Sequence, residues 1–236
     1  MSAGTETGST AAVDVYWLPL GAGASVVRWN GRLYEWCSAV LARRRPLDLY
    51  HGALIVAAAE SRYVIELAPA TDGNSTARGV VVEGPVGLGA LGRFRLFRYE
   101  LRCWPQGQLP DVEYAVASPQ RLTEDPVLVR SLLEQLRRVP PATWGRDEHR
   151  VGDMWNSNSA ISWLLFTARV PLPTLPPRGR APGWDAGIAV ARSNLGARST
   201  TTTHRTEDPR TAPQRTGPGL RCCPPSPLRR RTSSPT

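Results

Sequence analysis

A strongly apolar segment starts directly after four small polar residues, Asn156, Ser157, Asn158 and Ser159. Its apolar residues recur at the i, i+3, i+4 and i+7 spacing of one helix face, at Ile161, Leu164, Leu165 and Ala168, with Trp163 and Phe166 on other faces. A helix that is apolar nearly all round is buried, so the fold must cover this segment with other elements. Asn and Ser are preferred N-caps, because their side-chain oxygens accept backbone N–H groups that the first turn leaves unpaired. The segment therefore predicts a core helix with hydroxyls and amides at its positive end.

The residues before this helix have the pattern of a sheet. Five β-prone runs separated by Gly, Pro and polar turns predict strands over 13–20, 49–57, 63–67, 79–84 and 94–103. The second and third runs are close enough to form a hairpin. In the last run an apolar set (Phe97, Tyr99, Leu101, Cys103) alternates with a charged set (Arg98, Glu100, Arg102), which predicts one buried and one solvated face. Phe94 and Leu96 have the opposite parity, so a bulge is expected near 96–97.

Two more helices are predicted. Asn30 offers an N-cap to an amphipathic helix that reaches Leu41, and Asp125-Pro126 begins a helix that Pro140 ends. Together with the core helix, these segments predict an α+β fold, an antiparallel sheet of four to six strands packed with about three helices.

Charge divides the chain into a nearly neutral body and a basic tail. Of the net charge of +9, residues 178–236 carry +8, from 11 Arg against 3 acids. Residues 193–236 contain too few apolar side chains to offset the entropy of ordering, so we expect a disordered tail after a single domain over 13–192. Residues 187–191 are expected to add an edge strand. Because nucleic-acid binding depends on a clustered basic face, we expect none from the folded body.

Cysteine usage and hydropathy suggest a location. Four cysteines (Cys37, Cys103, Cys222, Cys223) form neither a C-x-x-C pair nor a disulfide framework, which favours a reducing compartment. The chain opens with no signal-peptide pattern and contains no run of about 18 apolar residues, so we expect a cytoplasmic protein without a membrane span. The loop acids and histidine (Asp147, Glu148, His149, Asp153) have no defensible metal-ligand spacing, so neither a metal nor a cofactor is expected.

His51 is the body's histidine that lies in a predicted strand. If the hairpin turn is centred near Ala58–Ala59, Glu66 lies opposite His51 or one diagonal away, within hydrogen-bond reach. A carboxylate there would orient the imidazole, and a serine at the positive end of a buried helix would be the nucleophile. The candidate catalytic residues are Ser157 (or Ser159) as nucleophile, His51 as base and Glu66 as the orienting acid.

Simpler interpretations stay open for each of these residues. Residues 156–159 could serve only as helix caps, His51 could be a hydrogen-bonded core residue, and Glu66 could pair with an arginine. Glu100 is expected on the solvated face, or could replace Glu66 as the acid. The candidate binding residues around the same cleft are Asn156, Asn158, Ser159, Trp155, Trp163, Tyr99, Glu100 and Trp104.

A strand-borne His51 followed by strands and then by a helix opening Asn156-Ser157-Asn158-Ser159 resembles circularly permuted NlpC-type, papain-like domains. Lecithin–retinol acyltransferase and the PPPDE peptidases have this order, and in PPPDE peptidases the helix begins Asn-Cys-Asn-His. The chain is more similar to an uncharacterised bacterial family with an early His, Tyr-Glu before Trp, Asn-Ser-Asn-Ser/Thr before Trp, Pro-Pro and Ala-Pro-Gly. The matching residues are His51, Tyr99-Glu100, Trp104, Asn156 to Ser159, Trp163, Pro176-Pro177 and Ala181-Pro182-Gly183, within about residues 13–192.

The papain-like resemblance implies a hydrolase or acyltransferase that acts on an amide or ester of a small molecule or peptide. Ser157 stands where the papain-like nucleophile is Cys. A serine hydroxyl lacks the easily formed ionised state of such a cysteine and depends wholly on its base. The alternative is a catalytically inactive binding domain that uses the same cleft.

Overall fold

The computed structural model describes residues 11–20, 43, 45–59, 61–70, 79–176 and 179–202, with side chains as far as residue 196. The helix predicted from Asn30 to Leu41 lies outside the described residues, and so do residues 203–236 of the predicted tail. The described residues form a sheet packed with three helices, which confirms the predicted α+β class.

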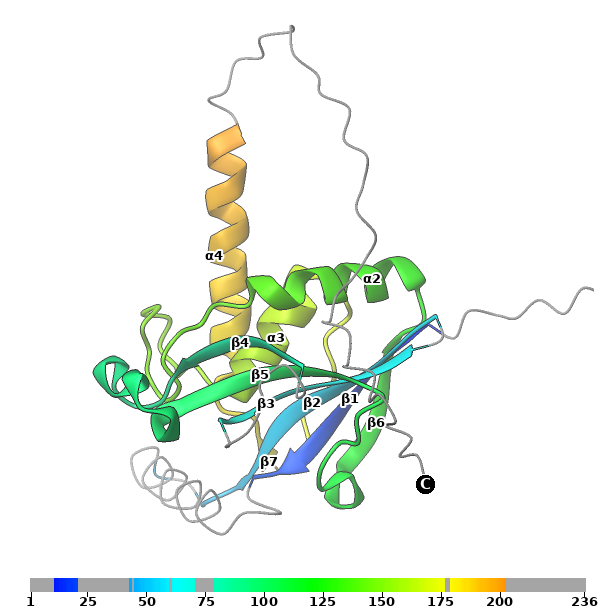
Figure 1. The fold of residues 1–236 in the computed structure, drawn as a ribbon, viewed down its shortest axis with the longest axis horizontal. Helices are drawn as coiled ribbons and strands as arrows, with labels where there is room; N and C mark the ends of the chain where they lie inside the picture. The colour runs from blue at the N-terminus through cyan, green and yellow to red at the C-terminus, as the bar shows by residue number, and fades with distance from the viewer. Residues whose placement is uncertain are drawn as a thin grey trace, which may run out of the picture.

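The sheet has seven strands: β1 (Ala12–Pro19), β2 (Asp48–Ala58), β3 (Ser61–Pro69), β4 (Val80–Pro85), β5 (Arg98–Pro105), β6 (Val116–Thr123) and β7 (Gly179–Arg180). Their order is β4-β5-β3-β2-β1-β6, with every neighbouring pair antiparallel, and β7 pairs in parallel with the start of β2 (Figure 1). The first four predicted strands are confirmed as β1 to β4, and the predicted hairpin is β2–β3.

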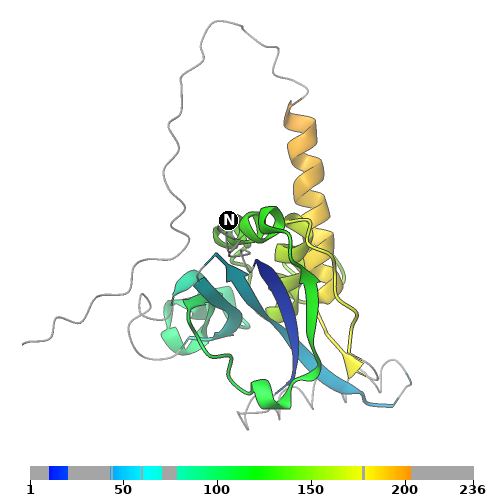
Figure 2. The same ribbon diagram turned by 90° about the vertical axis from the view of Figure 1, so that its right-hand side faces the viewer.

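The helices α2 (Pro126–Gln135), α3 (Ser157–Thr167) and α4 (Trp184–Thr202) lie on one face of the sheet, which we call the inner face (Figure 1). Figure 2 shows the same arrangement from the side, with α4 projecting away from the sheet. The core helix is confirmed as α3, whose Ile161 and Leu164 are fully buried. Among the described helices, none combines the length and hydropathy needed to cross a membrane.

Alternation along the strands divides side chains between the inner face and the opposite, outer face. On β5, Tyr99, Leu101 and Cys103 are buried in the main apolar core under the helices, as predicted. The outer face carries a smaller apolar cluster that includes Ala53 of β2 and Leu109 of the loop after β5. Both faces of the sheet centre are therefore covered.

The fourth predicted strand begins later than expected. Pro85 pairs with Arg98, and residues 86–97 form the connection between β4 and β5, closed by a hydrogen bond from the Val86 N–H to the Phe97 carbonyl (2.8 Å). They include two short 3-10 helices, η1 (Gly89–Arg93) and η2 (Arg95–Phe97). The predicted strand start at Phe94 and the bulge near 96–97 are wrong, and Phe97 is not part of the buried set.

Two further differences concern β6 and α4. The sequence did not predict β6, because Pro119 interrupts its pattern; an edge strand tolerates proline, and β6 pairs with β1 alone. The edge strand predicted over 187–191 is wrong, since these residues lie in α4, where Trp184 and Ile188 are buried. Helix α4 also includes residues 193–202, which follow the predicted domain boundary at residue 192.

Strands β2 and β3 separate partway along their length. Their pairing runs from Ala58↔Ser61 to Leu54↔Ile65, whereas β2 stays paired with β1 as far as Tyr50. The edge of β2 that faces β3 is therefore left without a strand partner at Gly52 and Tyr50. This opening lies beside the N-terminus of α3.

Candidate functional site

The N-terminus of α3 has a complete capping box. The Asn156 side chain accepts hydrogen bonds from the backbone N–H of Asn158 (2.9 Å) and Ser159 (3.2 Å). In return, Ser159 Oγ accepts from the Asn156 N–H and donates to the carbonyl of Met154. Both side chains are buried, 8% and 0% exposed, so their polar groups are used within the helix end.

Asn158 takes the place of the missing strand partner of β2. Its Oδ1 accepts from the Gly52 N–H (2.8 Å) and its Nδ2 donates to the Tyr50 carbonyl (2.9 Å), the two groups that β3 leaves unpaired. The same Nδ2 donates to the carbonyl of Pro182 (3.0 Å). A carboxamide carries a donor and an acceptor side by side, as a peptide unit does, which explains why asparagine fits this position.

The Ala181-Pro182-Gly183 segment packs directly on this capping box. Asn156 also donates to the Pro182 carbonyl (2.8 Å), and the Gly183 N–H donates to Asp153 (2.7 Å). Gly183 has a φ of +82°, and a Cβ there would lie 2.6 Å from Asn156 Oδ1 and Ser159 Oγ. The two motif stretches are therefore one structural unit.

Helices α3 and α4 cross closely where Gly187 faces α3. A Cβ at Gly187 would overlap the backbone carbonyl of Ser159 and the hydroxyl of Ser162. Ser162 Oγ instead donates to the carbonyl of Trp184 (2.7 Å). A larger residue at 187 would push the helices apart.

Ser157 differs from its three motif neighbours. Its side chain is 5% exposed, and its hydroxyl makes no hydrogen bond within the described part of the chain. As the first helical residue it lies at the positive end of α3. The Ser157 hydroxyl is therefore not used by the capping box.

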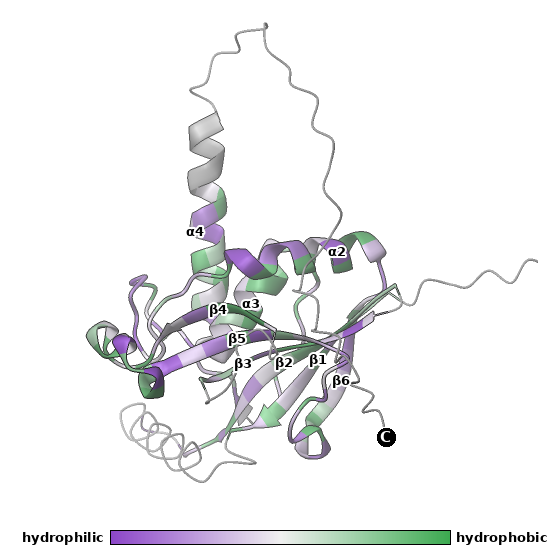
Figure 3. Ribbon diagram, viewed as in Figure 1, coloured by the Kyte–Doolittle hydropathy of each residue, from purple (hydrophilic) through white to green (hydrophobic). Residues whose placement is uncertain are grey.

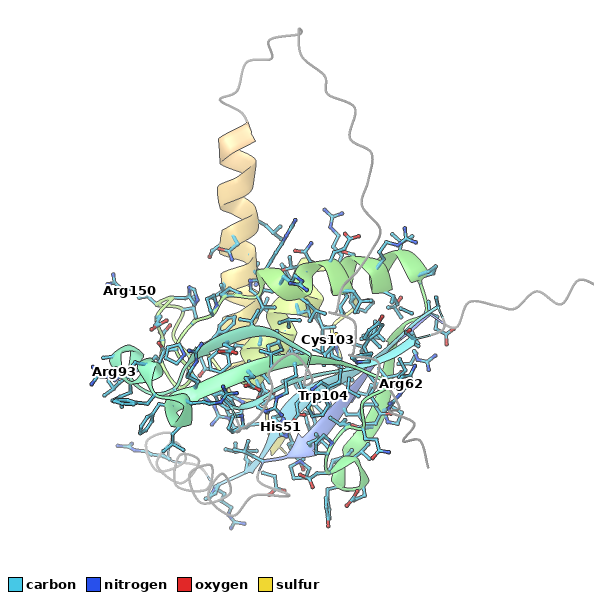
Figure 4. All side chains as sticks on the ribbon, viewed as in Figure 1. His51, Arg62, Arg93, Cys103, Trp104 and Arg150 are labelled. Carbon is cyan, nitrogen blue, oxygen red and sulfur yellow. The ribbon has the colours of Figure 1, made fainter. Side chains whose placement is uncertain are left out.

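The predicted base does not reach Ser157. Gly52 faces α3, because its N–H binds Asn158 and a Cβ there would lie 3.7 Å from Ile161. The adjacent side chain of His51 points to the opposite, outer face, where its β1 partner Leu18 belongs to the outer cluster (Figure 4). The triad of Ser157, His51 and Glu66 is not assembled, because the sheet separates its members. The sequence pattern could not show which face each strand residue takes.

The aromatic residues predicted to line one cleft lie on different faces of the sheet. Trp155 and Trp163 are 2% and 3% exposed in the main core, and Tyr99 donates its hydroxyl to the Ala142 carbonyl (2.7 Å). Burial raises the pKa of Tyr99, and the nearby Trp155 indole opposes that shift. Trp104 belongs to the outer face. These four residues do not line a common cleft.

The outer face gathers the remaining candidates into a second set. Glu66 of β3 pairs across the ladder with Arg102 of β5, and Glu100 and Trp104 lie on either side of Arg102 on the same face. Glu100 is 0% exposed and Arg102 7%, so the prediction of a solvated face here is wrong. Arg102 donates to Glu100 (3.0 Å) and to the Pro69 carbonyl (3.0 Å), and its guanidinium lies 5.4 Å from the Trp104 ring centre.

Two buried polar atoms in this set have no hydrogen-bond partner among the described residues. They are Oε2 of Glu66, whose residue is 9% exposed, and the indole Nε1 of Trp104. Buried polar groups without partners are rare and costly, so each calls for a reason. One atom is an acceptor and the other a donor, and both lie on the outer face of neighbouring strands.

Ionisation on the outer face is shifted toward the neutral forms. Burial lowers the pKa of His51 to about 4, although the nearby Asp111 carboxylate opposes the shift. Burial also raises the pKa of Glu66, with the Arg102 charge opposing and Asp111 reinforcing. Asp111 has a left-handed φ of +57° at the start of η3 (Val112–Tyr114). Sequence analysis missed Arg102 as a buried site residue and Asp111 altogether, since neither has a local signal of burial or proximity.

A surface pocket of about 340 Å³ lies elsewhere and is lined by Gly87, Leu88, Gly89, Thr143, Arg146, Asp147 and Glu148. Its carboxylates stabilise the loop: Glu148 accepts from the N–H and hydroxyl of Thr143, and Asp147 from the N–H groups of Val151 and Gly152. These bonds lower the pKa of both acids. No group of His, Cys, Asp and Glu that could hold a metal occurs in the described ranges.

Comparisons with family models, curated proteins and solved structures found no match to this chain. The permuted papain-like arrangement therefore stays a prediction from the sequence.

Proposed function

We propose that this domain is a non-catalytic binding domain and that its ligand lies on the outer face, over Glu66 and Trp104. The observation that supports this most is the pair of buried atoms without partners, Glu66 Oε2 and Trp104 Nε1. Both atoms are covered in this structure, so the ligand reaches them when the covering side chains move aside; by donating to the first and accepting from the second it would then supply the two missing hydrogen bonds.

The ligand chemistry follows from these two atoms and their spacing. Glu66 pairs with Arg102 and Val64 with Trp104, so Glu66 and Trp104 are diagonal neighbours, whose backbone positions are about 7–8 Å apart. Successive residues of an extended chain advance about 3.3 Å. Two or three residues of a short extended peptide would therefore present N–H and C=O groups over this distance.

The other outer-face residues suit recognition better than catalysis. With its pKa lowered to about 4, His51 is neutral at pH 7 and offers one donor and one acceptor nitrogen. Arg102 is held by Glu100 and Pro69 and stacks near the Trp104 ring, so it fixes the site's shape. Among the described residues of the outer face, no serine or cysteine nucleophile accompanies them. Cys103 lies on the other face, in the inner core.

The test is an NMR titration of the ¹⁵N-labelled full chain with N-acetylated dipeptide amides. The Trp104 indole N–H signal, assigned by its loss in Trp104→Phe, is expected to shift on titration. Glu66→Gln is expected to weaken the apparent affinity, whereas Glu83→Gln on β4 serves as the matched control and keeps it. An indole signal that stays in place up to saturating peptide, or titrates equally in Glu66→Gln, would overturn the proposal.

A further inference from the structure

The connection between β4 and β5 forms an exposed apolar and basic tip. Its large apolar residues are Leu96 (84% exposed), Leu88 (52%), Phe94 (49%) and Phe97 (37%). Leu88 and Phe94 flank η1, and Leu96 and Phe97 lie in η2, at the edge of the sheet away from β1 and β6. Figure 3 shows hydrophobic and hydrophilic residues mixed there. Four of the eleven large exposed apolar residues of the described chain thus fall within ten positions. Such clustering is typical of an interaction surface.

The charge of this tip has one sign. Residues 86–99 contain Arg93, Arg95 and Arg98 and no acid. Arg98 is paired with Glu83 (2.5 Å) and Arg95 with the buried Glu100 (3.3 Å). The Arg93 guanidinium lies over the Phe94 ring at 4.7 Å, and Figure 4 labels Arg93 at the outer end of the tip. Of the three arginines, Arg93 has no acidic partner among the described residues, so a partner that is both apolar and anionic would match Phe94, Leu96 and Arg93.

We infer that the tip binds the surface of an anionic lipid bilayer, with Phe94 and Leu96 in the interfacial region and Arg93 among the headgroups. Apolar and aromatic side chains flanked by arginines suit this interface, where arginines contribute through the negative surface potential. A symmetric contact with a second copy would place like charges together. A stable protein complex usually buries about 800 Å² of surface on each partner. The ten residues of this projecting turn supply less than that.

The experiment is sedimentation of the full chain with vesicles of phosphatidylcholine alone or with phosphatidylserine. Binding is expected only to the serine-containing vesicles, and Leu96→Ser is expected to weaken it about tenfold, from the apolar surface it no longer inserts. Arg93→Ser should weaken it about fivefold at low salt. Val127→Ser makes the same kind of change, apolar to serine, at a residue of α2 that is 69% exposed. It should change vesicle binding less than about twofold.

The basic residues after 202 are common to all these variants, so the differences among the variants report on the tip alone. Equal binding by Leu96→Ser and Val127→Ser would overturn the inference. So would self-association of the wild-type chain that Leu96→Ser abolishes while no variant binds vesicles. These outcomes do not bear on the outer-face site, which the peptide titration tests separately.

Discussion

Replacing Asn158 by alanine should destabilise the fold far more than replacing its neighbour Ser157. The Asn158 carboxamide makes three hydrogen bonds, to Gly52, Tyr50 and Pro182, from a side chain that is 2% exposed. In Asn158→Ala the Pro182 carbonyl keeps its bond from Asn156, whereas the Gly52 N–H and Tyr50 carbonyl lose their partners. A buried polar group left unpaired costs about 1–3 kcal/mol, so the expected loss from the two groups is about 2–6 kcal/mol.

The matched control is Ser157→Ala. Its hydroxyl makes no hydrogen bond within the described residues, so the expected change is within about 0.5 kcal/mol. Thermal unfolding followed by circular dichroism measures both variants. For a domain of this size, about 2–4 °C per kcal/mol predicts a midpoint lowered by about 4–24 °C for Asn158→Ala and almost unchanged for Ser157→Ala. A loss below about 1 kcal/mol for Asn158→Ala, or a larger loss for Ser157→Ala, would refute the idea that Asn158 replaces a strand.

Three further variants test the packing and electrostatics. Gly187→Ala should lower the free energy of unfolding by more than about 2 kcal/mol, because the added methyl group overlaps α3. Gly196→Ala, with open space around it, should be neutral or stabilising. Chemical denaturation measures both variants. The pKa of His51 is lowered to about 4 in the folded state, so the unfolded state binds more protons below pH 6.5. The free energy of unfolding should therefore fall by about 1–3 kcal/mol between pH 6.5 and 4. Denaturation at several pH values should show that His51→Gln lacks this component. The pKa of Glu66 is raised, so its ionised form is disfavoured in the folded state; Glu66→Gln should raise the thermal midpoint at pH 7 and have a smaller effect at pH 4.

The local patterns of the sequence predicted most of the helices and strands, because each pattern indicates which residues of one segment share a face. The period of two around Tyr99 and Leu101 predicted their burial, and Asn156 was correctly placed at the start of a buried helix. The same patterns say nothing about what covers the second face. Glu100 and Arg102 were therefore expected in solvent, although both are buried.

The predicted triad failed at the point where long-range geometry decides. The hairpin register was nearly correct: the ladder from Ala58↔Ser61 to Leu54↔Ile65, extended by one residue, places Ala53 opposite Glu66, with His51 one diagonal away. The sequence could not predict that β2 and β3 separate on the N-terminal side of Leu54 in β2. Nor could it predict that α3 lies against the inner face, opposite His51. A shift of one residue along a strand reverses the face of every side chain, so no spacing rule within one segment could have joined His51 to Ser157.

The motifs behind the resemblance are largely explained by packing. Asn156, Asn158 and Ser159 meet Pro182 and Gly183 in one hydrogen-bonded unit, so the pattern Asn-x-Asn-Ser with Ala-Pro-Gly follows from the need to close the gap in β2 and to bring α4 against α3. A pattern that packing explains in this way is no argument for shared chemistry. Among the buried side-chain atoms without a partner in the described residues, Glu66 Oε2 and Trp104 Nε1 lie on the outer face of neighbouring strands, away from this unit, and that is where a function that is absent from the motif should be sought.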